Sequence, residues 1–290
     1  MKNILIVGCG DIAMRIAPLL RTHYKLFGLI RNASRKEQLH ALGVTPILAD
    51  LDHRAQLRKI AGLADVVLHL APPPNSSADD TRTQNLLAAL SQGRLPQRLI
   101  YISTTGVYGD CGGEIVRETR ALNPQSARAR RRVDAEQRIC TWAARNAVKA
   151  SILRVPGIYA KERLPIERLR SATPAIIAEE DSCTNHIFAD DLARMVIAAV
   201  RYAKPNRVYH ASDDSELKMG DYFDEVADAF NLPRPPRLPR DEVKQSVSPV
   251  LWSFMNESRR LSNKRIKQEL KIKLQYPQVS DALKVFTQVS

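Results

Sequence analysis

Residues that could bind phosphate groups or other anions lie at three places in this chain. The first is the glycine loop Gly8-Cys9-Gly10-Asp11-Ile12-Ala13. Gly8 would permit a tight turn from strand to helix, Gly10 would let a pyrophosphate approach the backbone, and Ala13 is small where helix meets strand. The N–H groups at the start of such a helix face the phosphates. The loop therefore predicts a dinucleotide-binding site formed by residues 8–13.

The second place is the end of the next expected strand, where Arg31-Asn32-Ala33-Ser34-Arg35 contains no acidic residue. NAD-binding proteins usually carry Asp or Glu here, to bond the ribose 2′-hydroxyl. A carboxylate would repel a 2′-phosphate, whereas Arg31 together with Asn32 can bind one. The sequence therefore predicts NADP rather than NAD as the cofactor. The alternative for Arg31 is a solvent-exposed charge beside a helix.

The third place is a pair of arginines, Arg128 and Arg132, at the start of an expected helix, and their spacing of four residues is one that shares a helix face. A guanidinium group stays protonated and cannot act as a base, but it can hold a carboxylate or phosphate. Arginines near a helix start also oppose the helix dipole. An anion or an acidic neighbour would offset that cost, and the alternative is a solvated charged face.

The elements that must position these residues alternate along the chain. Apolar runs predict strands at 3–7, 25–30, 45–48, 66–70, 99–102 and 150–153, and helical patterns predict helices at 11–20, 35–42, 54–61, 81–91 and 130–146. Continuous apolar strands separated by helices are typical of a parallel sheet covered on both faces. The predicted fold class is α/β, a Rossmann-type doubly wound parallel sheet. The proline-rich segment 232–240 predicts an extended linker or wall.

Bulk composition limits the class of protein. The chain has 290 residues, of which 44% are hydrophobic and 26% charged, which is ordinary for a soluble globular protein. No stretch approaches a membrane-spanning length. Scattered cysteines argue against a disulfide framework and fit a reducing cytoplasm. The net charge of +13 suits an anionic partner or a generally basic surface, but no motif supports specific nucleic-acid binding.

With these features the chain resembles the extended short-chain dehydrogenase/reductase superfamily, in the NAD(P)-dependent epimerase/dehydratase group. The stretch 103–109, S-T-T-G-V-Y-G, is similar to the family motif S-[ST]-x-x-V-Y-G, and residues 185–193 are similar to its N-x-I-H-V-x-D-L-A segment. The family's Y-x-x-x-K pair is absent, because Arg128 stands at the Tyr position and Arg132 at the Lys position. The chain therefore resembles the branch of nucleoside-diphosphate-sugar epimerase-like proteins that lack this pair.

The resemblance implies roles for residues around the missing pair. Thr104 would orient a substrate oxygen, and Arg132 would bond the nicotinamide ribose as the family's Lys does. Arg128 would then hold a substrate carboxylate or phosphate. Tyr108 is the nearest alternative phenol for proton transfer, and Tyr159 is another candidate at the substrate.

Other turns also fit the resemblance. It implies that Asp50-Leu51 lies beside the adenine and that Leu70-Ala71 lies beside the cofactor. His69 is expected to be a core histidine. His186, Asp190 and Asp191 have spacings that suggest a metal site on paper, but helix capping by one of the aspartates explains them better, and no metal is expected.

These observations predict a Rossmann domain over residues 1–155 that binds NAD(P), and a smaller mixed substrate-binding domain over 156–290, with some segments returning to the sheet. The predicted function is NADP-dependent oxidoreductase or epimerase (isomerase) chemistry on a small polar, anionic or nucleotide-linked substrate. The alternative is a catalytically inactive NADP-binding sensor or scaffold, which the two arginines favour, whereas Thr104 and the V-Y-G turn favour the enzyme. The sequence leaves the oligomeric state open, a homodimer included.

Overall fold

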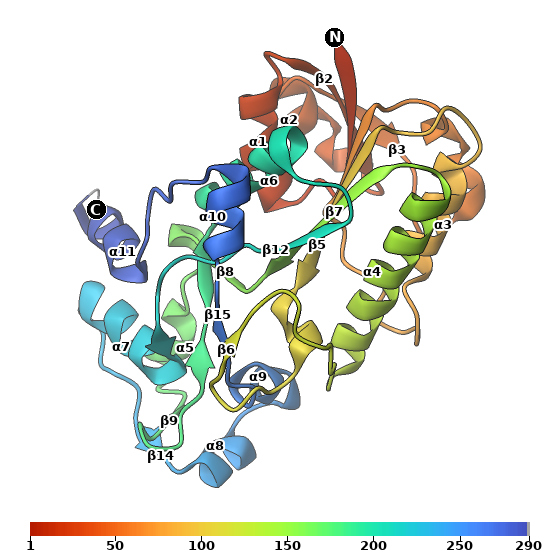
Figure 1. The fold of residues 1–290 in the computed structure, drawn as a ribbon. Coiled ribbons are helices and arrows are strands. Elements are labelled where there is room, and N and C mark those ends of the chain that lie inside the picture. Colours follow the sequence, from red (N-terminus) through yellow and green to blue (C-terminus); the bar gives the residue numbers. More distant parts are fainter. Residues whose placement is uncertain (289–290) are drawn as a thin grey trace.

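A seven-stranded parallel sheet forms the centre of the computed structural model, which describes residues 1–288 (Figure 1). The strands are β1 (Lys2–Val7), β2 (Tyr24–Ile30), β3 (Val44–Leu48), β4 (Val66–His69), β5 (Arg98–Thr104), β7 (Lys149–Val155) and β12 (Arg207–His210). Their order in space is β12-β7-β5-β4-β1-β2-β3, and all neighbours are parallel. The chain builds outward from β1 to β3 and then returns to β4 on the other side of β1. The predicted Rossmann-type doubly wound sheet is therefore confirmed.

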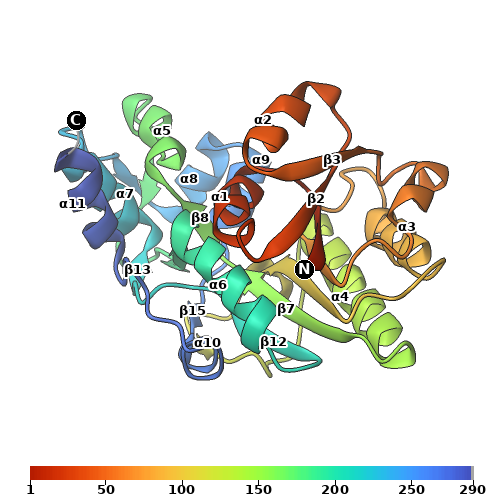
Figure 2. The ribbon, with the colours of Figure 1, turned by 90° about the horizontal axis from the view of Figure 1, so that it is seen from above.

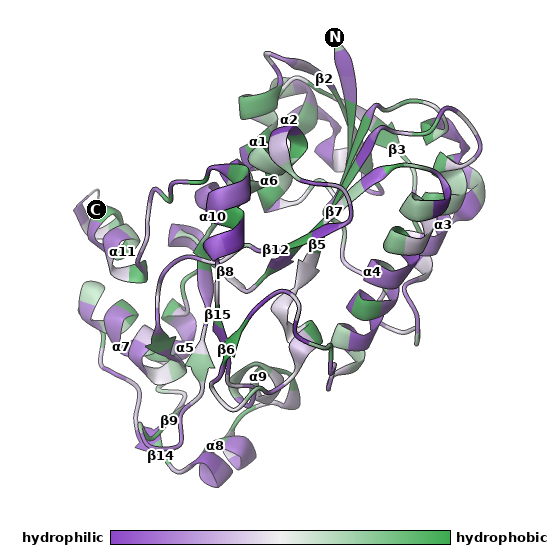
Figure 3. Ribbon diagram, viewed as in Figure 1, coloured by the Kyte–Doolittle hydropathy of each residue, from purple (hydrophilic) through white to green (hydrophobic). Residues whose placement is uncertain are grey.

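Helices cover both faces of this sheet, because successive side chains of a strand point to opposite sides. The main covering helices are α1 (Asp11–Leu20), α3 (Thr81–Leu90), α4 (Ala127–Arg145) and α6 (Ala189–Tyr202). In β1, Ile4 and Ile6 belong to the core under α1 and α6, whereas Leu5 and Val7 belong to the core under α3 and α4. Figure 2 shows these pairs of helices on opposite sides of the sheet, and Figure 3 shows its central strands as largely hydrophobic.

Most of the chain after Val155 forms a smaller part made of short elements, drawn at the left and bottom of Figure 1. Its strands pair as β8 (Gly157–Tyr159) with β11 (His186–Phe188), β9 (Ala175–Ile176) with β14 (Arg237–Leu238), β10 (Cys183–Thr184) with β13 (Leu217–Lys218), and β15 (Arg260–Leu261) with the earlier β6 (Ile115–Val116). Its helices are α5 (Ile166–Arg170), α7 (Met219–Ala229), α8 (Arg240–Ser246), α9 (Pro249–Met255), α10 (Lys264–Leu270) and α11 (Val279–Gln288). Strand β12 and helix α6 instead belong to the central sheet and its covering layer.

The remaining short helices lie in the first part of the chain or at its border with the second. They are α2 (Lys36–Ala41) and the 3-10 helices η1 (Ala33–Arg35), η2 (Arg54–Ile60), η3 (Thr105–Tyr108) and η4 (Lys161–Arg163). Thus the predicted helix at 54–61 is a 3-10 helix, and the proline-rich segment 232–240 contributes the strand β14. Helix α4 begins at Ala127, earlier than the predicted residue 130, because the Ser126 hydroxyl caps it by accepting a hydrogen bond from the Ala129 N–H.

The prediction that Asp190 or Asp191 caps a helix is wrong. Helix α6 follows Phe188, and no side chain caps its start. Both aspartates lie in its first turn and bond elsewhere: Asp191 accepts hydrogen bonds from the Gln275 and Tyr276 N–H groups, and Asp190 pairs with Arg15 of α1 at 2.6 Å. These contacts fasten α6 to α1 and to the segment before α11, which the sequence spacing alone did not reveal.

The glycine loop gives a direct test of this packing. At Gly8, φ is +95° and an added Cβ would lie 2.5 Å from the Ala71 nitrogen, whereas at Gly10 an added Cβ would meet nothing within 4 Å. We expect Gly8→Ala to lower the free energy of unfolding by at least ~2 kcal/mol, through backbone strain and overpacking. The matched variant Gly10→Ala should lose less than ~1 kcal/mol. Urea denaturation checks both values, and equal stability of the two variants would contradict the tight turn at Gly8.

Candidate active site

The carboxyl ends of the central strands border an open cleft of about 720 Å³, here named the cofactor cleft. Its lining includes the sequence-predicted cofactor residues Gly8, Gly10, Asp11, Ile12, Ala13, Arg31, Asn32, Asp50, Leu51, Leu70 and Ala71. These residues come from turns after four different strands. They meet because parallel strands deliver their carboxyl ends to one edge of the sheet, which is where open α/β sheets bind ligands.

The glycine loop forms a wall of this cleft that fits a dinucleotide. Gly10 is the N-cap residue of α1, so the first N–H groups of that helix face the cleft. A Cβ at Gly10 would occupy open space, which is the space that an approaching pyrophosphate needs. Asp11 beside it does not leave an unbalanced negative charge, because its carboxylate pairs with Arg15 at 3.0 Å and Arg163 at 3.3 Å.

The end of β2 presents positive charge to the cleft and carries no carboxylate. Arg31 is exposed and lies at the lining, and Arg35 donates a hydrogen bond from Nη1 to the Cys9 carbonyl at 2.8 Å. The Asn32 side chain accepts the Ser34 N–H at 3.0 Å and thereby caps η1. Arg31 makes no hydrogen bond or ion pair within residues 1–288, so its guanidinium is available to a ligand phosphate.

The turns after β3 and β4 complete the cleft. One Asp50 carboxylate oxygen accepts the Asp52 N–H at 3.0 Å, which fixes the turn and leaves the other oxygen accessible. Ala71 lies directly against Gly8, so the two turns are in contact. His69, just before them, is fully buried and bonds the Thr83 hydroxyl through Nε2 at 2.8 Å. Burial lowers its pKa to about 3, so this histidine is a neutral core residue.

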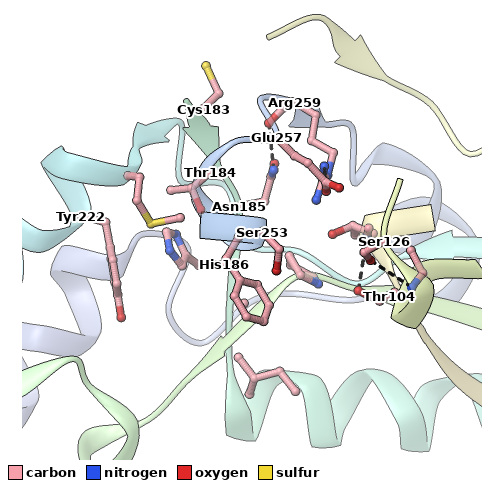
Figure 4. Close-up of a pocket in the computed structure, with 18 of the residues that line it drawn as sticks. Thr104, Ser126, Cys183, Thr184, Asn185, His186, Tyr222, Ser253, Glu257 and Arg259 are labelled. Carbon is pink, nitrogen blue, oxygen red and sulfur yellow. Dashed lines mark hydrogen bonds and ion pairs between the residues drawn. The ribbon is translucent and has the colours of Figure 1, made fainter. Parts of the chain in front are cut away.

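A second hollow of about 270 Å³, here named the inner cavity, adjoins the cofactor cleft and shares Ile158 with it. It lies between the sheet edge and the smaller part of the chain (Figure 4). Its lining residues are Thr104, Thr105, Gly106, Ser126, Arg128, Ala129, Pro156, Gly157, Ile158, Tyr159, Cys183, Thr184, Asn185, His186, Met219, Tyr222, Ser253, Phe254, Glu257 and Arg259. Three sequence-predicted site residues, Thr104, Arg128 and Tyr159, therefore come together here.

Thr104 ends β5 at the border of the inner cavity. Its Oγ1 accepts the Gly106 N–H at a long 3.3 Å and caps the 3-10 helix η3. The hydroxyl hydrogen remains free to donate to an oxygen in the cavity. Thr104 and Ser126 lie on one side of the cavity in Figure 4, with His186 and Tyr222 on the other.

Arg128 brings a positive charge to the inner cavity. Its guanidinium carbon lies 4.1 Å from the centre of the Phe254 ring. Partial burial lowers its pKa, Glu257 raises it, and Arg132 and Arg131 lower it. No hydrogen bond or ion pair to this guanidinium occurs within residues 1–288, so the protein itself leaves its donors unused.

Glu257 and Arg259 line the same cavity. They form an ion pair at 2.7 Å, and the same Arg259 Nη1 also donates to the Gly109 carbonyl at 2.7 Å. Because Arg259 neutralises Glu257, the charge of Arg128 is left over. The inner cavity therefore carries a net positive charge, which favours an anionic ligand.

The opposite wall holds a set of buried polar side chains. The ring of His186 is 5% exposed and stacks on Tyr222 at 4.1 Å, and Tyr159 meets it edge-on at 6.2 Å. Burial lowers the pKa of His186 to about 3, so the imidazole is neutral. Asp213 lies behind them, and burial raises its pKa to about 8. The Tyr159 hydroxyl is sealed from solvent, and burial raises its pKa well above the usual value.

Arg132 does not line either hollow. Its Nη1 donates to the Tyr101 hydroxyl at 2.9 Å and to the Ile102 carbonyl at 2.8 Å, behind the sheet edge. Arg132 Nη1 would therefore have to give up these two acceptors, or share them, to make the expected contact with a nicotinamide ribose. Positive charge from Arg132 also reaches His69 and lowers its pKa further.

Tyr108 lies outside both hollows, contrary to the expectation that it could transfer a proton to a substrate. It is 1% exposed, and its hydroxyl bonds His210 Nε2 and Arg154 Nη1, each at 2.6 Å. Arg154 in turn forms a buried ion pair with Glu136 at 2.6 Å. Burial raises the pKa of Tyr108 to about 12 although Arg154 opposes the rise. Its placement explains the V-Y-G turn as a structural feature, because all the polar groups around the phenol belong to the fold.

Several residues of the inner cavity were not identified from sequence. Glu257 and Arg259 reach it because the segment before β15 bonds the loop before β6: the Ser258 carbonyl accepts the Cys111 and Gly113 N–H groups. No local spacing marks such long-range contacts. Ser126 was overlooked although it stands directly before the arginine-rich helix, where a helix-capping serine is a recognisable signal.

Two features of the described chain bear on the class of site. Within residues 1–288, no group of three or more His, Cys, Asp or Glu side chains is arranged to hold a metal ion. Over the same residues, none of the helices has the length and apolar character that crossing a membrane requires.

Comparison with known proteins shows which family this chain is similar to. The pattern described as the NAD dependent epimerase/dehydratase family matches residues 4–212. A conserved protein of unknown function from Silicibacter pomeroyi is 29% identical and superposes with a TM-score of 0.81, covering 100% of this chain and 99% of its own. UDP-glucuronic acid 4-epimerase from Bacillus cereus, solved with UDP-glucuronic acid and NAD, is 19% identical with a TM-score of 0.76, over 99% of this chain and 98% of its own.

A curated relative matches a smaller region. The 4-hydroxy-2-methyl-3-oxo-4-farnesyl-3,4-dihydroquinoline-1-oxide ketoreductase of Stigmatella aurantiaca is 28% identical over an alignment of 119 residues that covers 38% of this chain. The match spans about a third (35%) of that relative's length.

The placement of Tyr108 predicts a structural phenotype. Tyr108→Phe removes the buried hydrogen bonds that the phenol makes with Arg154 Nη1 and His210 Nε2, so we expect a loss of ~1–3 kcal/mol in the free energy of unfolding. Dinucleotide binding should stay unchanged in the folded variant. The control Tyr202→Phe removes an exposed hydroxyl and should stay within ~0.5 kcal/mol of wild type. A Tyr108→Phe protein of wild-type stability that had lost turnover would restore a catalytic role for this phenol.

Proposed function

The chain belongs to the NAD-dependent epimerase/dehydratase family, and we propose that it is an NADP-dependent enzyme that oxidises or reduces a small anionic substrate. Catalysis would take place without the family's Tyr–Lys pair. The observation that carries the proposal is the shared wall of the two hollows: a cleft with a dinucleotide loop opens beside a small cavity that holds Thr104 and the unpaired Arg128.

The cofactor cleft supports a dinucleotide with a 2′-phosphate. Gly8 and Gly10 leave room for the pyrophosphate, and Asp50 and Leu51 would flank the adenine. Arg31, with Asn32 at its side, would hold the 2′-phosphate, and Arg35 adds positive charge nearby. When bound, the cofactor supplies or accepts a hydride at its nicotinamide ring.

The inner cavity supports an anion as the substrate. Arg128 would bind a substrate carboxylate or phosphate, because its guanidinium has no partner in the described chain. Thr104 would donate a hydrogen bond to the reacting oxygen. Neither arginine can act as a base, so proton transfer must involve another group or water. The volume of the inner cavity, about 270 Å³, lies below the ~300–1,000 Å³ of usual ligand pockets. This favours a small molecule over a whole nucleotide sugar as the substrate.

A second candidate function is an NADP-binding sensor without turnover. One observation favours it: Arg132 uses its Nη1 for Tyr101 and Ile102, so the ribose contact that the family's Lys makes is already contested. In that case the inner cavity would bind an effector rather than a substrate.

Cofactor preference provides a quantitative test. A charge-assisted hydrogen bond contributes ~1.5–3 kcal/mol, so NADPH should bind about tenfold or more tightly than NADH at low salt. Arg31→Asp should reverse this order, since a carboxylate repels the 2′-phosphate and can bond a 2′-hydroxyl. Arg58→Asp, which changes an exposed arginine outside the cleft lining, is the control for net charge. Equal dissociation constants in the wild type, measured by fluorescence titration, would refute the NADP assignment.

Turnover separates the two candidate functions. Wild-type protein should oxidise NADPH in the presence of small oxo acids. Thr104→Ala should slow that reaction by up to ~10²-fold, because it removes a hydrogen bond to the reacting oxygen. Arg128→Gln should mainly raise KM if the arginine binds the carboxylate.

The double variant Arg128→Tyr/Arg132→Lys is the matched comparison. Under the enzyme proposal it should lose the wild-type reaction. A silent wild type, together with a double variant that gains activity on nucleotide sugars, would instead support the sensor function.

A further inference from the structure

The small volume of the inner cavity, about 270 Å³, means that one ligand would touch both of its walls. Thr104 lies on one wall and His186 and Tyr222 on the other (Figure 4), and Arg128 lines the same space. A ligand in this cavity would lie beside both walls. Its charged end and its uncharged oxygens must therefore match different groups around the same space.

The charged end is defined by Arg128. Its guanidinium lies over the Phe254 ring at 4.1 Å and has no hydrogen-bond acceptor within residues 1–288. Glu257 does not serve as that acceptor, because Arg259 already bonds it at 2.7 Å. The surplus of one positive charge matches the single negative charge of a carboxylate better than the double charge of a phosphate.

The uncharged end is defined by His186. This ring is 5% exposed, stacks on Tyr222 at 4.1 Å, and makes no hydrogen bond within residues 1–288. Its Nδ1 is sealed from solvent without a partner, whereas Nε2 is not among the sealed atoms, so Nε2 is the ring nitrogen open to a ligand. A buried imidazole without partners is costly unless a ligand or water completes its bonds. Because burial keeps the ring neutral, it suits a hydroxyl or carbonyl oxygen rather than an anion.

The β8–β11 pair places this ring beside Gly157. His186 stands opposite Gly157, and a Cβ on Gly157 would be in van der Waals contact with His186 Cδ2 at 3.4 Å. Both residues line the inner cavity.

We propose that the inner cavity binds a short hydroxylated carboxylic acid, with its carboxylate on Arg128 and a hydroxyl or oxo oxygen on Nε2 of His186. His186 is then the specificity-determining residue of the site. The assignment rests on the proposed function only in that the same cavity is used, because the binding itself requires no cofactor.

Calorimetric titration of the full chain with three matched four-carbon probes tests this assignment. Threonate carries a carboxylate and hydroxyls, butyrate carries only the carboxylate, and threitol carries only hydroxyls. We expect threonate to bind at least tenfold more tightly than either of the others, because only threonate satisfies both walls. Equal binding of threonate and butyrate would overturn the role of His186, and stronger binding of inorganic phosphate than of threonate would overturn the choice of a carboxylic acid.

Variants assign the two ends separately. Arg128→Gln should weaken threonate at least tenfold, whereas Arg130→Gln, which removes an exposed charge of the same helix outside the cavity, should leave its affinity unchanged. His186→Phe keeps the stacking on Tyr222 and should lower threonate affinity to that of butyrate without changing butyrate. His186→Gln retains an amide donor and should recover part of the loss. Threonate binding that survives both Arg128→Gln and His186→Phe would overturn the proposal.

Titrations with threonate and with NADPH test the carboxylic-acid site of the inner cavity (the acid site) and the proposed NADP-dependent function separately. NADPH titration of the same samples reports the cofactor cleft independently of threonate. Threonate binding without NADPH binding would refute the NADP-dependent function and leave the acid site standing. NADPH binding without discrimination among the three probes would refute the acid site and leave the NADP-dependent function standing.

Discussion

The buried ion pair between Arg154 and Glu136 is the interaction on which the arrangement of the site depends. Both side chains are about 5% exposed, and two hydrogen bonds of 3.1 Å and 2.6 Å join them. The pair fastens α4 to β7, and Tyr108 extends it to η3 and to His210 of β12. Such a pair is no strong source of stability by itself, but breaking it would leave an unpaired buried charge at a cost of ~3–5 kcal/mol. The start of α4, and with it Arg128, is thereby held beside Thr104.

Arginines at the start of α4 conflict with the helix dipole, and the fold resolves each one differently. Arg131 is buried and donates to the Ser77 carbonyl at 2.8 Å, which holds the loop after β4. Arg132 bonds Tyr101 and the Ile102 carbonyl. Arg128 makes a cation–π contact with the Phe254 ring and is attracted by the negative charge of Glu257, but it has no hydrogen-bond acceptor within residues 1–288. A positive charge therefore remains at the position where the resemblance leads us to expect a phenol, and the proposed function must accommodate it.

The two hollows differ in what they demand of a ligand. The cofactor cleft is built mainly from backbone turns at strand ends, so the fold itself determines its shape. The inner cavity is built from side chains of α4, α7, α9, β8 and the β11 region. Similarity to nucleotide-sugar epimerases at 19% identity therefore describes the fold and not the contents of this cavity.

The sequence by itself determined the Rossmann sheet, the glycine loop, and the order of the turns that line the cofactor cleft. It could do so because apolar periodicity and glycine turns are local signals, and because parallel strands bring successive turns to one edge. Only the tertiary structure decided that Tyr108 is a buried part of the core, that Arg132 bonds its own sheet, and that Glu257, Arg259 and His186 share a cavity with Arg128. These outcomes depend on contacts between residues distant in the chain, from Arg132 with Ile102, 30 positions apart, to Ser258 with Cys111, and no spacing along the chain encodes them.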